Sequence, residues 1–392
     1  MGRHYTCAVH KLPFSDCFGT LPDNLTDFSL LPRSYFMLSV SRSRRLLCGI
    51  LLTLSTHLSA VAADTAALEK ATDQLAQSGF QGAVVAARGD QIFLQKSIGN
   101  FGALNKTFRF ASVTKMMTAI LIMQEVDAGK LKLDDALEKY WPDYPNADAR
   151  KTTIRQLLMH YSGLYNENAI PDFHMKAANR GDNMQEFATG VCAQAVQAAP
   201  GARFDYNNCD YMVLGALLEK LNRQSFQQLL QKRVFQPAGM KQAGLYTAAM
   251  QDNPSHVHGI LNGQPEPEVN LASYGAAGSS FGTLPDLIAM NRAFIQGKLI
   301  SAAARAEMTK PNATGGALGV WVYPFSGADP AKPVVITERQ GWIAGLRILN
   351  LVDTNSGNIL ILVSTNGDLD MTQTWANQGP AAPLLTALLK TR

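Results

Sequence analysis

Residues 112–128 read Ser-Val-Thr-Lys-Met-Met-Thr-Ala-Ile-Leu-Ile-Met-Gln-Glu-Val-Asp-Ala. They are good helix formers, apolar nearly all round the predicted helix, and Gly129 supplies a stop signal directly after them. A helix with no polar face has to be buried, so this segment predicts a helix at the centre of a core. The chain is long enough for such a core, because it has 392 residues, of which 46% are apolar and only 17% charged.

The segments on either side of this helix predict strands. Residues 82–87 and 91–95 read as a β-hairpin around the turn at 88–90, and later strands are expected at 317–323, 334–338, 346–352 and 358–364. Other helices are expected at 64–77, 211–221, 225–234 and 380–390. The predicted fold class is α+β, with an antiparallel sheet formed by the N- and C-terminal segments and a mainly helical lobe over about residues 150–310.

The buried helix starts with a candidate nucleophile, Ser112, and a candidate base, Lys115. Positions three apart on a helix share a face, so the Lys115 amine can lie against the Ser112 hydroxyl. Burial favours the neutral form of a lysine, which can accept the serine proton, and the helix N-terminus favours developing negative charge. A Ser-x-x-Lys spacing is common in chains of this size, so its position at the start of an apolar helix is the informative feature.

A second polar segment, residues 204–211, reads Phe-Asp-Tyr-Asn-Asn-Cys-Asp-Tyr and leads into another predicted helix. The phenol of Tyr206 would lose its proton more readily beside an ammonium group and could then relay protons to a leaving group. Asn208 can donate a hydrogen bond to a substrate carbonyl. An isolated Tyr-x-Asn is more often a helix cap with packing tyrosines, so these residues need a wider context.

Ser112-x-x-Lys115, followed about ninety residues later by Tyr206-x-Asn208, resembles the serine β-lactamase and DD-peptidase superfamily, in particular its class C-like branch of carboxypeptidases and esterases. The resemblance extends from about residue 80 to the end of the chain and includes the segments 153–164, 235–240 and 277–283. It implies a β-lactamase/transpeptidase-like fold. It also implies catalytic roles for Ser112, Lys115 and Tyr206, a substrate-binding role for Asn208, and no metal or organic cofactor.

The third motif of this superfamily is a Lys or His, a small residue and a Gly on the strand beside the active site. The matching segment reads Arg339-Gln340-Gly341-Trp342 and departs from the pattern at its first two positions. The resemblance implies that Arg339, Gln340 and Gly341 bind substrate, and Arg339 retains a cation that can bind a carboxylate. The oxyanion hole would consist of the backbone N–H groups of Ser112 and Trp342. The alternative is that Arg339 only covers the edge of the sheet.

Residues 278–282, Gly-Ser-Ser-Phe-Gly, also fit the Gly-x-Ser-x-Gly elbow of α/β-hydrolases, which would make Ser280 the nucleophile. That triad is completed by an acidic residue and then a histidine further along the chain. The last histidine of this chain is His258, so the order cannot be completed, and we interpret the segment as a turn packed near the site. His160 is interpreted as a residue that holds a loop or packs in the core.

The resemblance implies an enzyme that forms an acyl-serine on an amide or ester, with D-alanyl-D-alanine carboxypeptidase activity as the first expectation. β-Lactamase and carboxylesterase activities are alternatives within the family, and a catalytically inactive binding or scaffold protein on the same fold is the alternative from another class. The expected partner is a small molecule or a peptide, such as a peptidoglycan stem peptide. The sequence leaves open whether Lys115 or Tyr206 is the general base, because their titrations would be coupled.

The N-terminal region predicts export. The basic segment 41–45 is followed by an apolar run and a stretch of small residues, which is the layout of a secretory signal peptide cleaved after Ala62. Residues 1–36 are interpreted as an upstream extension or a misassigned start, 37–62 as the signal, and 63–392 as one domain of two lobes. We therefore expect a periplasmic or secreted protein with no membrane span after signal cleavage.

Charge and cysteine content narrow the class further. Residues 1–62 carry six Lys or Arg and three Asp or Glu, which leaves 29 and 28 for the rest, so the nearly neutral body indicates no nucleic-acid partner. Only Cys192 and Cys209 of the five cysteines follow the signal. In an oxidising compartment they could pair, and the sequence leaves this open. Neither has a second Cys or a His at ligand spacing, which disfavours a metal site.

Overall fold

The structure is a computed structural model that describes residues 65–178, 181, 183–247 and 256–391. The predicted upstream extension and signal peptide, residues 1–36 and 37–62, lie outside the described residues. Among the helices described, none combines the length and the apolar character that crossing a membrane requires.

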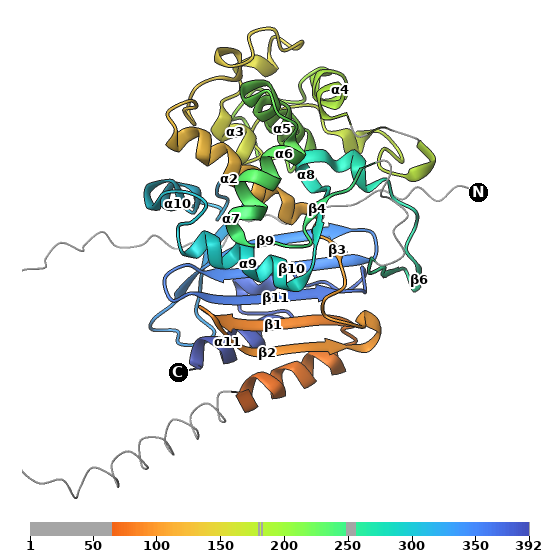
Figure 1. Ribbon diagram of the computed structural model, residues 1–392, viewed down its shortest axis with the longest axis vertical. Helices are drawn as coiled ribbons and strands as arrows, with labels where there is room; N and C mark the ends of the chain where they lie inside the picture. The colour runs from red at the N-terminus through yellow and green to blue at the C-terminus, as the bar shows by residue number, and fades with distance from the viewer. Residues whose placement is uncertain (1–64, 179–180, 182, 248–255, 392) are drawn as a thin grey trace, which may run out of the picture.

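A six-stranded antiparallel sheet is the main feature, with the strand order β2-β1-β11-β10-β9-β8. Its strands are β1 (Gly82–Arg88), β2 (Gln91–Ile98), β8 (Trp321–Phe325), β9 (Val334–Ile343), β10 (Leu346–Asp353) and β11 (Asn358–Ser364). β1 pairs with β11 from Gly82↔Ser364 to Arg88↔Asn358. Figure 1 shows the N-terminal hairpin in orange beside the C-terminal strands in blue, which confirms the predicted sheet.

Both faces of this sheet are covered, which explains why its central strands are apolar without alternation. Successive side chains of a strand point to opposite faces. Val85 therefore packs in the large core that the sheet shares with the helical lobe, whereas Val84 packs in a second core on the other face. The helix over residues 65–77 and α11 (Ala382–Lys390) contribute further side chains to this second core.

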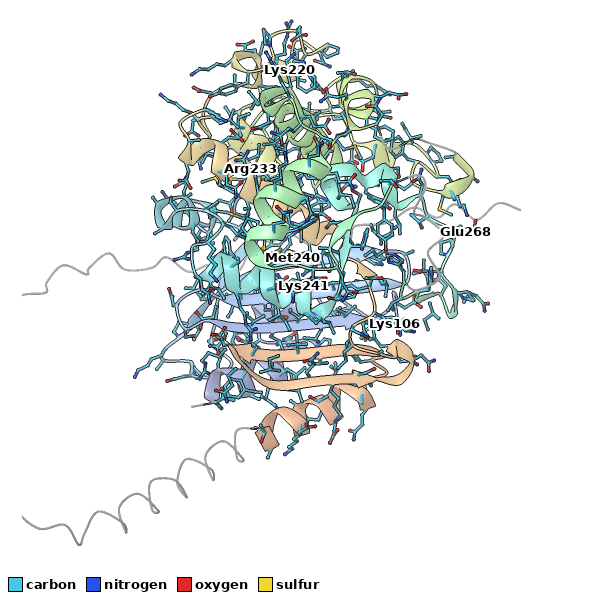
Figure 2. All side chains as sticks on the ribbon, viewed as in Figure 1. Lys106, Lys220, Arg233, Met240, Lys241 and Glu268 are labelled. Carbon is cyan, nitrogen blue, oxygen red and sulfur yellow. A yellow bond between two sulfur atoms is a disulfide. The ribbon has the colours of Figure 1, made fainter. Side chains whose placement is uncertain are left out.

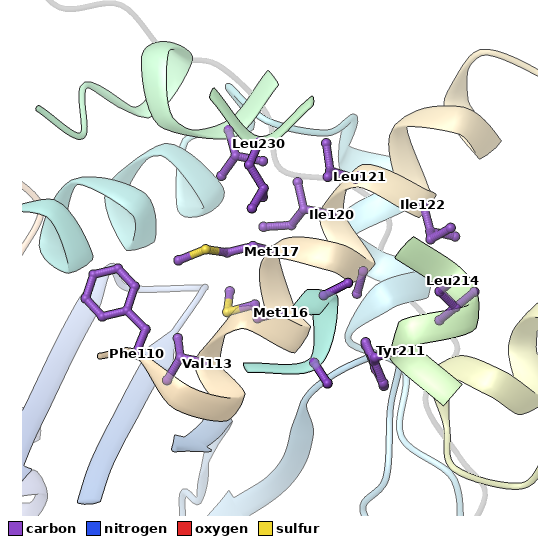
Figure 3. Close-up of a cluster of buried hydrophobic side chains, with 14 of the residues drawn as sticks. Phe110, Val113, Met116, Met117, Ile120, Leu121, Ile122, Tyr211, Leu214 and Leu230 are labelled. Atoms are coloured by element: carbon purple, nitrogen blue, oxygen red, sulfur yellow. The ribbon is translucent and has the colours of Figure 1, made fainter. Parts of the chain in front are cut away.

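The helical lobe surrounds α2 (Thr114–Asp127), whose residues from Thr114 to Met123 are all buried. Figure 3 shows Met116 and Ile120 of this helix among side chains of other elements, including Leu230. The predicted central helix is thereby confirmed. The other helices are α3 (Ile154–Leu158), α4 (Met184–Thr189), α5 (Asn208–Asn222), α6 (Phe226–Leu230), α7 (Gln236–Ala238), α8 (Gly275–Gly278), α9 (Leu284–Ile295) and α10 (Ala302–Met308). Short strands form two small sheets, β3 (Phe108–Arg109) with β7 (Ser280–Gly282) and β4 (Gly244–Leu245), and β5 (Ile260–Leu261) with β6 (Gln264–Pro265).

The strand expected at 317–323 begins later, at Trp321. The expectation is wrong for the preceding residues because Gly319 takes a positive φ of 77° in a tight turn. A Cβ at Gly319 would lie 2.7 Å from the Cβ of Ala119, so the turn also packs too closely against α2 for any larger residue.

β9 extends beyond the predicted end at residue 338 and runs on to Ile343. β8 pairs with it only as far as Trp321↔Glu338, whereas β10 pairs with it along its later part, up to Leu346↔Ile343. In the part of the chain that the structure describes, the stretch of β9 from Arg339 onward therefore has a free edge. This stretch contains the predicted third motif.

Candidate active site

Ser112 lies in a short 3-10 turn, Ala111–Val113, that joins β3 to α2. Ala111 takes a positive φ of 49°, which a residue with a Cβ rarely adopts, so the chain turns sharply just before Ser112. The turn packs against β9, where a Cβ on Gly341 would lie 2.5 Å from the carbonyl oxygen of Phe110. The glycine of the third motif is therefore needed for close backbone approach, and it brings the free edge of β9 beside Ser112.

The two candidate proton-transfer groups meet at the Ser112 hydroxyl. The Oγ of Ser112 lies 3.2 Å from Lys115 Nζ and 2.8 Å from Tyr206 OH. Lys115 is fully buried in the first turn of α2, whereas Tyr206 is half-buried and comes from the loop before α5. Two segments that are distant in the sequence thus converge on one oxygen atom, as the motif pattern predicts.

Lys115 is surrounded by three hydrogen-bond acceptors. Its Nζ donates to Ser112 Oγ, to Asn208 Oδ1 at 2.6 Å and to the carbonyl oxygen of Ala277 at 2.9 Å. Of these three only the serine hydroxyl can also donate, so a neutral lysine would accept its proton from Ser112. Burial lowers the pKa of Lys115, against the opposing effect of the Tyr206 oxygen. The lysine therefore reaches its neutral, proton-accepting form at a lower pH than an exposed one.

Arg339 completes the cluster from the free edge of β9. Its Nε donates to the carbonyl oxygen of Ser112 at 2.8 Å, and its Nη2 donates to Tyr206 OH at 2.6 Å. Burial alone would raise the pKa of Tyr206, but the charges of Arg339 and Lys115 outweigh it and lower this pKa to about 8. The phenol can therefore take part in proton transfer well below the ordinary tyrosine pKa of about 10.

Asn208 is engaged at both ends of its amide. Its Oδ1 accepts from Lys115, and its Nδ2 donates to Glu167 Oε1 at 2.6 Å. The predicted hydrogen bond from Asn208 to a substrate carbonyl would have to use the second N–H of this amide group. The predicted substrate-binding role is compatible with this arrangement and stays a prediction.

The other residues of the third motif have different surroundings. The Nε2 of Gln340 donates to Glu338, and alternation along the strand places both side chains on the face opposite to Arg339. The Nε1 of Trp342 donates to the carbonyl oxygen of Ala344 at 2.9 Å. The substrate contact of Gln340 and the oxyanion role of the Trp342 backbone N–H stay predictions.

Ser280 and His160 lie close to the cluster without joining it. Ser280 is fully buried on β7, with its Oγ 2.6 Å from Thr114 Oγ1, which is a packing position and not an exposed elbow. His160 Nδ1 lies 3.0 Å from Asp210 Oδ2 and accepts from the backbone N–H of Asn207 at 3.2 Å. Burial raises the pKa of Asp210 and lowers that of His160, so for both groups it favours the uncharged form. His160 therefore holds the loop that carries Tyr206, as its interpretation from sequence suggested.

The sequence did not reveal Glu167, a fully buried carboxylate in the loop before α4. It lies in the polar stretch Tyr-Asn-Glu-Asn of residues 165–168, and no spacing or motif distinguishes it there. Burial of its charge is the signal, and burial becomes visible only when the fold is known. Cys192 and Cys209 form a disulfide with a Cα–Cα distance of 5.2 Å, which resolves the alternative that the sequence left open.

The described residues contain no group of three or more His, Cys, Asp or Glu side chains arranged to hold a metal ion.

Comparison with known proteins gives concordant findings. A family model described as Beta-lactamase matches residues 67–373. The chain is 25% identical over 307 residues to a protein of Bacillus subtilis (strain 168) that is named as a penicillin-binding protein, PbpX. The comparison covers 76% of this chain and 73% of PbpX. Penicillin-binding protein 4 of Amycolatopsis lactamdurans is 31% identical over 251 residues, which are 60% of this chain and 64% of that protein.

Among solved structures, D-amino acid amidase from Ochrobactrum anthropi SV3, complexed with L-phenylalanine amide, superimposes with a TM-score of 0.69. The comparison covers 84% of this chain and 99% of the amidase chain, at 20% sequence identity. At this identity the likeness shows a shared fold.

Proposed function

The chain belongs to the β-lactamase family of serine hydrolases, and from this premise we propose that it cleaves the amide bond on the carboxyl side of a D-amino acid, as a D-alanyl-D-alanine carboxypeptidase does. The family and the β-lactamase/transpeptidase-like fold predicted from the sequence are confirmed. The observation that carries the proposal is the convergence of Lys115 and Tyr206 on the Ser112 hydroxyl, with Arg339 against the Tyr206 oxygen.

The reaction begins when the Ser112 oxygen attacks the substrate carbonyl and its proton passes to the Lys115–Tyr206 pair. The carbonyl oxygen becomes an oxyanion, which the backbone N–H groups of Ser112 and Trp342 would stabilise. The C–N bond then breaks, the pair returns the proton to the leaving amine, and an acyl-Ser112 ester remains. Water attacks this ester with the same pair as base, and the acid and the free serine are restored.

The arrangement argues against the inactive-scaffold alternative. Burying a lysine costs desolvation free energy. An enzyme can use the buried amine as a proton acceptor, whereas a binding protein gains nothing from it. The lowered pKa of Tyr206, about 8, is likewise what a proton-transfer group needs. We therefore assign catalytic roles to Ser112, Lys115 and Tyr206.

Two kinds of support favour substrates that contain D-amino acids. Two relatives carry names that describe penicillin-binding proteins, and a protein of the same fold is a D-amino acid amidase. The free edge of β9 beside Ser112 also offers backbone groups to an extended peptide, which could add to it as a further strand. A peptidoglycan stem peptide is one such substrate.

A second candidate, hydrolysis of D-amino acid amides, is favoured by the contacts of Arg339. Its Nε and one N–H of Nη2 are already occupied by Ser112 and Tyr206, so a substrate carboxylate would have to use the N–H groups of Nη1 and the second N–H of Nη2. A neutral amide substrate would need no such cation. β-Lactams and simple esters remain the alternatives within the same chemistry.

The test is mass spectrometry of the purified protein with a D-alanyl-D-alanine tripeptide, D-alaninamide, a fluorescent penicillin and a short-chain nitrophenyl ester. We expect acylation at Ser112 and turnover of one or both D-alanyl substrates, with their L counterparts untouched. Turnover of the ester alone would refute the D-amino acid assignment. Absence of any covalent adduct on Ser112 would refute the acyl-serine mechanism.

We also propose that the protein is exported after cleavage near Ala62. The disulfide between Cys192 and Cys209 supports this proposal, because disulfides persist mainly in oxidising compartments. N-terminal sequencing of protein recovered from the cell envelope or medium should begin at or near Ala63. Recovery of intact residues 1–36 on the exported protein would contradict it.

A further inference from the structure

The loop after α3 is tied to the segment that carries Tyr206 by side-chain hydrogen bonds in both directions. The Nδ2 of Asn207 donates to the carbonyl oxygens of Leu164 at 3.1 Å and Tyr165 at 3.0 Å. The Nδ2 of Asn166 donates back to the carbonyl oxygen of Tyr206 at 3.0 Å. The loop therefore acts as a template that fixes the backbone of the Tyr-x-Asn motif.

Glu167 is the charged residue of this template. Its side chain is fully buried, and its Oε1 accepts from Asn208 Nδ2 at 2.6 Å and lies 3.6 Å from His174 Nε2. Burial alone would raise the pKa of Glu167, but His174 and the Asn208 amide outweigh it and hold this pKa below its ordinary value. A charge at this depth is costly, so its retention calls for a specific use.

The contacts on either side of Asn208 indicate that use. An amide has one end that accepts and one end that donates, whereas a carboxylate only accepts and an ammonium group only donates. Glu167 takes the donating end, so the accepting Oδ1 has to face Lys115, 2.6 Å away. A flipped amide would place oxygen against the carboxylate and N–H groups against the ammonium, which are two repulsive contacts.

We propose that Glu167 is a positioning residue of the active site: it fixes the orientation of the Asn208 amide and, through that amide, holds the Lys115 nitrogen beside Ser112. Glu167 acts through Asn208 and has no contact with the Ser112 hydroxyl. This inference rests on the proposed function, since it assigns a purpose to the lysine of the acyl-serine mechanism.

The charged and titratable groups around Lys115 in the described part of the chain include Tyr206, Arg339 and, across the amide, Glu167. Further groups are Tyr211, whose ring lies 5.5 Å from Nζ, and the buried pair of His160 and Asp210. Arg339 lowers the pKa of Lys115 and Glu167 raises it. The two groups therefore have opposite effects on the proton affinity of the Lys115–Tyr206 pair. This opposition gives a readout that loss of structure alone would not produce.

The first test is Glu167→Gln, assayed by the pH dependence of kcat/KM with a nitrophenyl ester and a D-alanyl-D-alanine tripeptide. Glutamine can present either oxygen or N–H to Asn208, so the orientation is no longer selected. We expect kcat to fall by roughly ten- to a hundredfold with KM changed by less than about threefold. The acidic limb should move to lower pH by about half a unit or more, because the charge that raises the pKa of Lys115 is gone.

The matched control is Glu268→Gln. Glu268 lies at the periphery of the molecule, where its side chain is 79% exposed and pairs with Lys176 at 3.5 Å (Figure 2). The same chemical change there should leave kcat and the pH limb within error of wild type. Equal effects of the two substitutions would overturn the assignment, because they would reflect net charge alone.

The second test is a double-mutant cycle with Asn208→Ala, measured as the rate of ester acylation in a single turnover. If Glu167 acts through the amide, Glu167→Gln should cost less than about twofold once Asn208 is absent. A full and independent cost in that background would overturn the proposal.

If Glu167→Gln is recovered unfolded, Glu167→Asp supplies the same cycle, because it keeps the charge and withdraws the acceptor by one methylene. A loss of about tenfold in kcat that vanishes in the Asn208→Ala background supports positioning, and an equal loss in both backgrounds refutes it. A wild-type protein that forms no acyl-Ser112 would refute the proposed function itself. Wild-type acylation with an unaltered Glu167→Gln variant would refute only the role of Glu167.

Discussion

Two arginines are buried to the same extent near the active site, and they differ in their partners. Arg109 on β3 and Arg339 on β9 are each 4% exposed. Arg109 forms an ion pair with the buried Glu266 and donates from Nε to the carbonyl oxygen of Ile343 at 3.1 Å. Arg339 donates to a backbone carbonyl and to Tyr206, and no carboxylate among the described residues lies within ion-pair distance of it.

The difference decides what each charge does. The charge of Arg109 is neutralised on the spot by Glu266, so the pair ties β3 to the region where β9 ends. The charge of Arg339 is not neutralised by an acid and acts on the next polar group, the Tyr206 phenol, whose pKa is about 8. We therefore expect Arg109, which faces an acid, to stabilise the fold, and Arg339, which faces a hydroxyl, to act in the proposed catalysis.

The largest loss of activity should follow substitution of Ser112, the proposed nucleophile, whose carbonyl oxygen accepts a hydrogen bond from Arg339. Ser112→Ala should abolish acylation and lower turnover by roughly 10⁴-fold or more, because it removes the hydroxyl that is proposed to accept the acyl group. Mass spectrometry and nitrophenyl ester hydrolysis measure both losses. Ser280→Ala is the control and should keep most activity, since Ser280 is buried against Thr114. Labelling on Ser280 would contradict the assignment of Ser112, and with it the catalytic role proposed for Arg339.

Arg339→Ala should lower kcat about a hundredfold for both neutral esters and D-alanyl peptides, because it removes a donor from Tyr206 and Ser112. Arg339 lowers the pKa values of both Lys115 and Tyr206, so its removal raises the proton affinity of the pair. The acidic limb of kcat/KM should therefore move to higher pH, the opposite of the shift expected for Glu167→Gln.

Arg339→Ala also distinguishes two roles of the guanidinium, which are binding of a substrate carboxylate and lowering of the pKa of Tyr206. The sequence alone predicts a carboxylate-binding arginine, whose loss would raise KM for carboxylate-bearing substrates such as D-alanyl peptides by roughly ten- to a hundredfold and leave neutral ester hydrolysis almost unchanged. The measurement uses both substrates across pH 6 to 10. A higher KM for the peptide with an unaltered rate for the ester would show that the hydrogen bond from Arg339 to Tyr206 does not contribute to catalysis.

The features that could be predicted from the sequence are those that depend on local residue patterns or on a known motif. The central helix and the hairpin could be predicted because apolar runs and turn residues are local features. Ser112, Lys115 and Tyr206 could be predicted because their order and spacing are those of a known family. The late start of β8 could not, since Gly319 turns there to fit against Ala119, a residue far away in the sequence.

The contacts of the cluster were also beyond the reach of the sequence. Whether Arg339 meets a substrate carboxylate or Tyr206 depends on how β9 packs against the turn at Ser112. Glu167 becomes notable only once it is buried against Asn208. Such long-range arrangements follow from the packing of the whole chain and leave no periodicity or spacing behind.

Breaking the ion pair of Arg109 should lower the stability of the protein and leave its catalytic rate nearly unchanged. Glu266→Gln should lower the free energy of unfolding by about 3 to 5 kcal/mol, because Arg109 would be left as an uncompensated buried charge. The catalytic rate of the folded variant should stay within about threefold of wild type. Urea denaturation followed by tryptophan fluorescence measures the loss, with the exposed Glu268→Gln as control. A stable variant with lost activity would make Arg109 a functional group like Arg339.

The smallest effect expected is the acid sensitivity that the Arg109–Glu266 pair confers on the wild-type protein. Burial alone would raise the pKa of Glu266, but hydrogen bonds from His258, Arg109 and the Gly345 N–H, together with the Arg109 charge, lower it from 4.5 to about 2. The folded state thus holds this carboxyl ionised more firmly than the unfolded chain does. The resulting stabilisation is fully present above about pH 5 and disappears as the pH falls towards 2.

The shift from 4.5 to about 2 corresponds to about 3 kcal/mol, given about 1.4 kcal/mol for each unit of pKa. Other carboxylates contribute to acid unfolding as well, so the quantity to measure is the difference in unfolding free energy between wild type and Glu266→Gln, in which those contributions cancel. This difference should stay constant from pH 7 to about 5 and then shrink by about 3 kcal/mol by pH 2. A difference that does not depend on pH would mean that Glu266 is not held ionised by Arg109. The contrast between the neutralised arginine and the one that acts on Tyr206 would then fail.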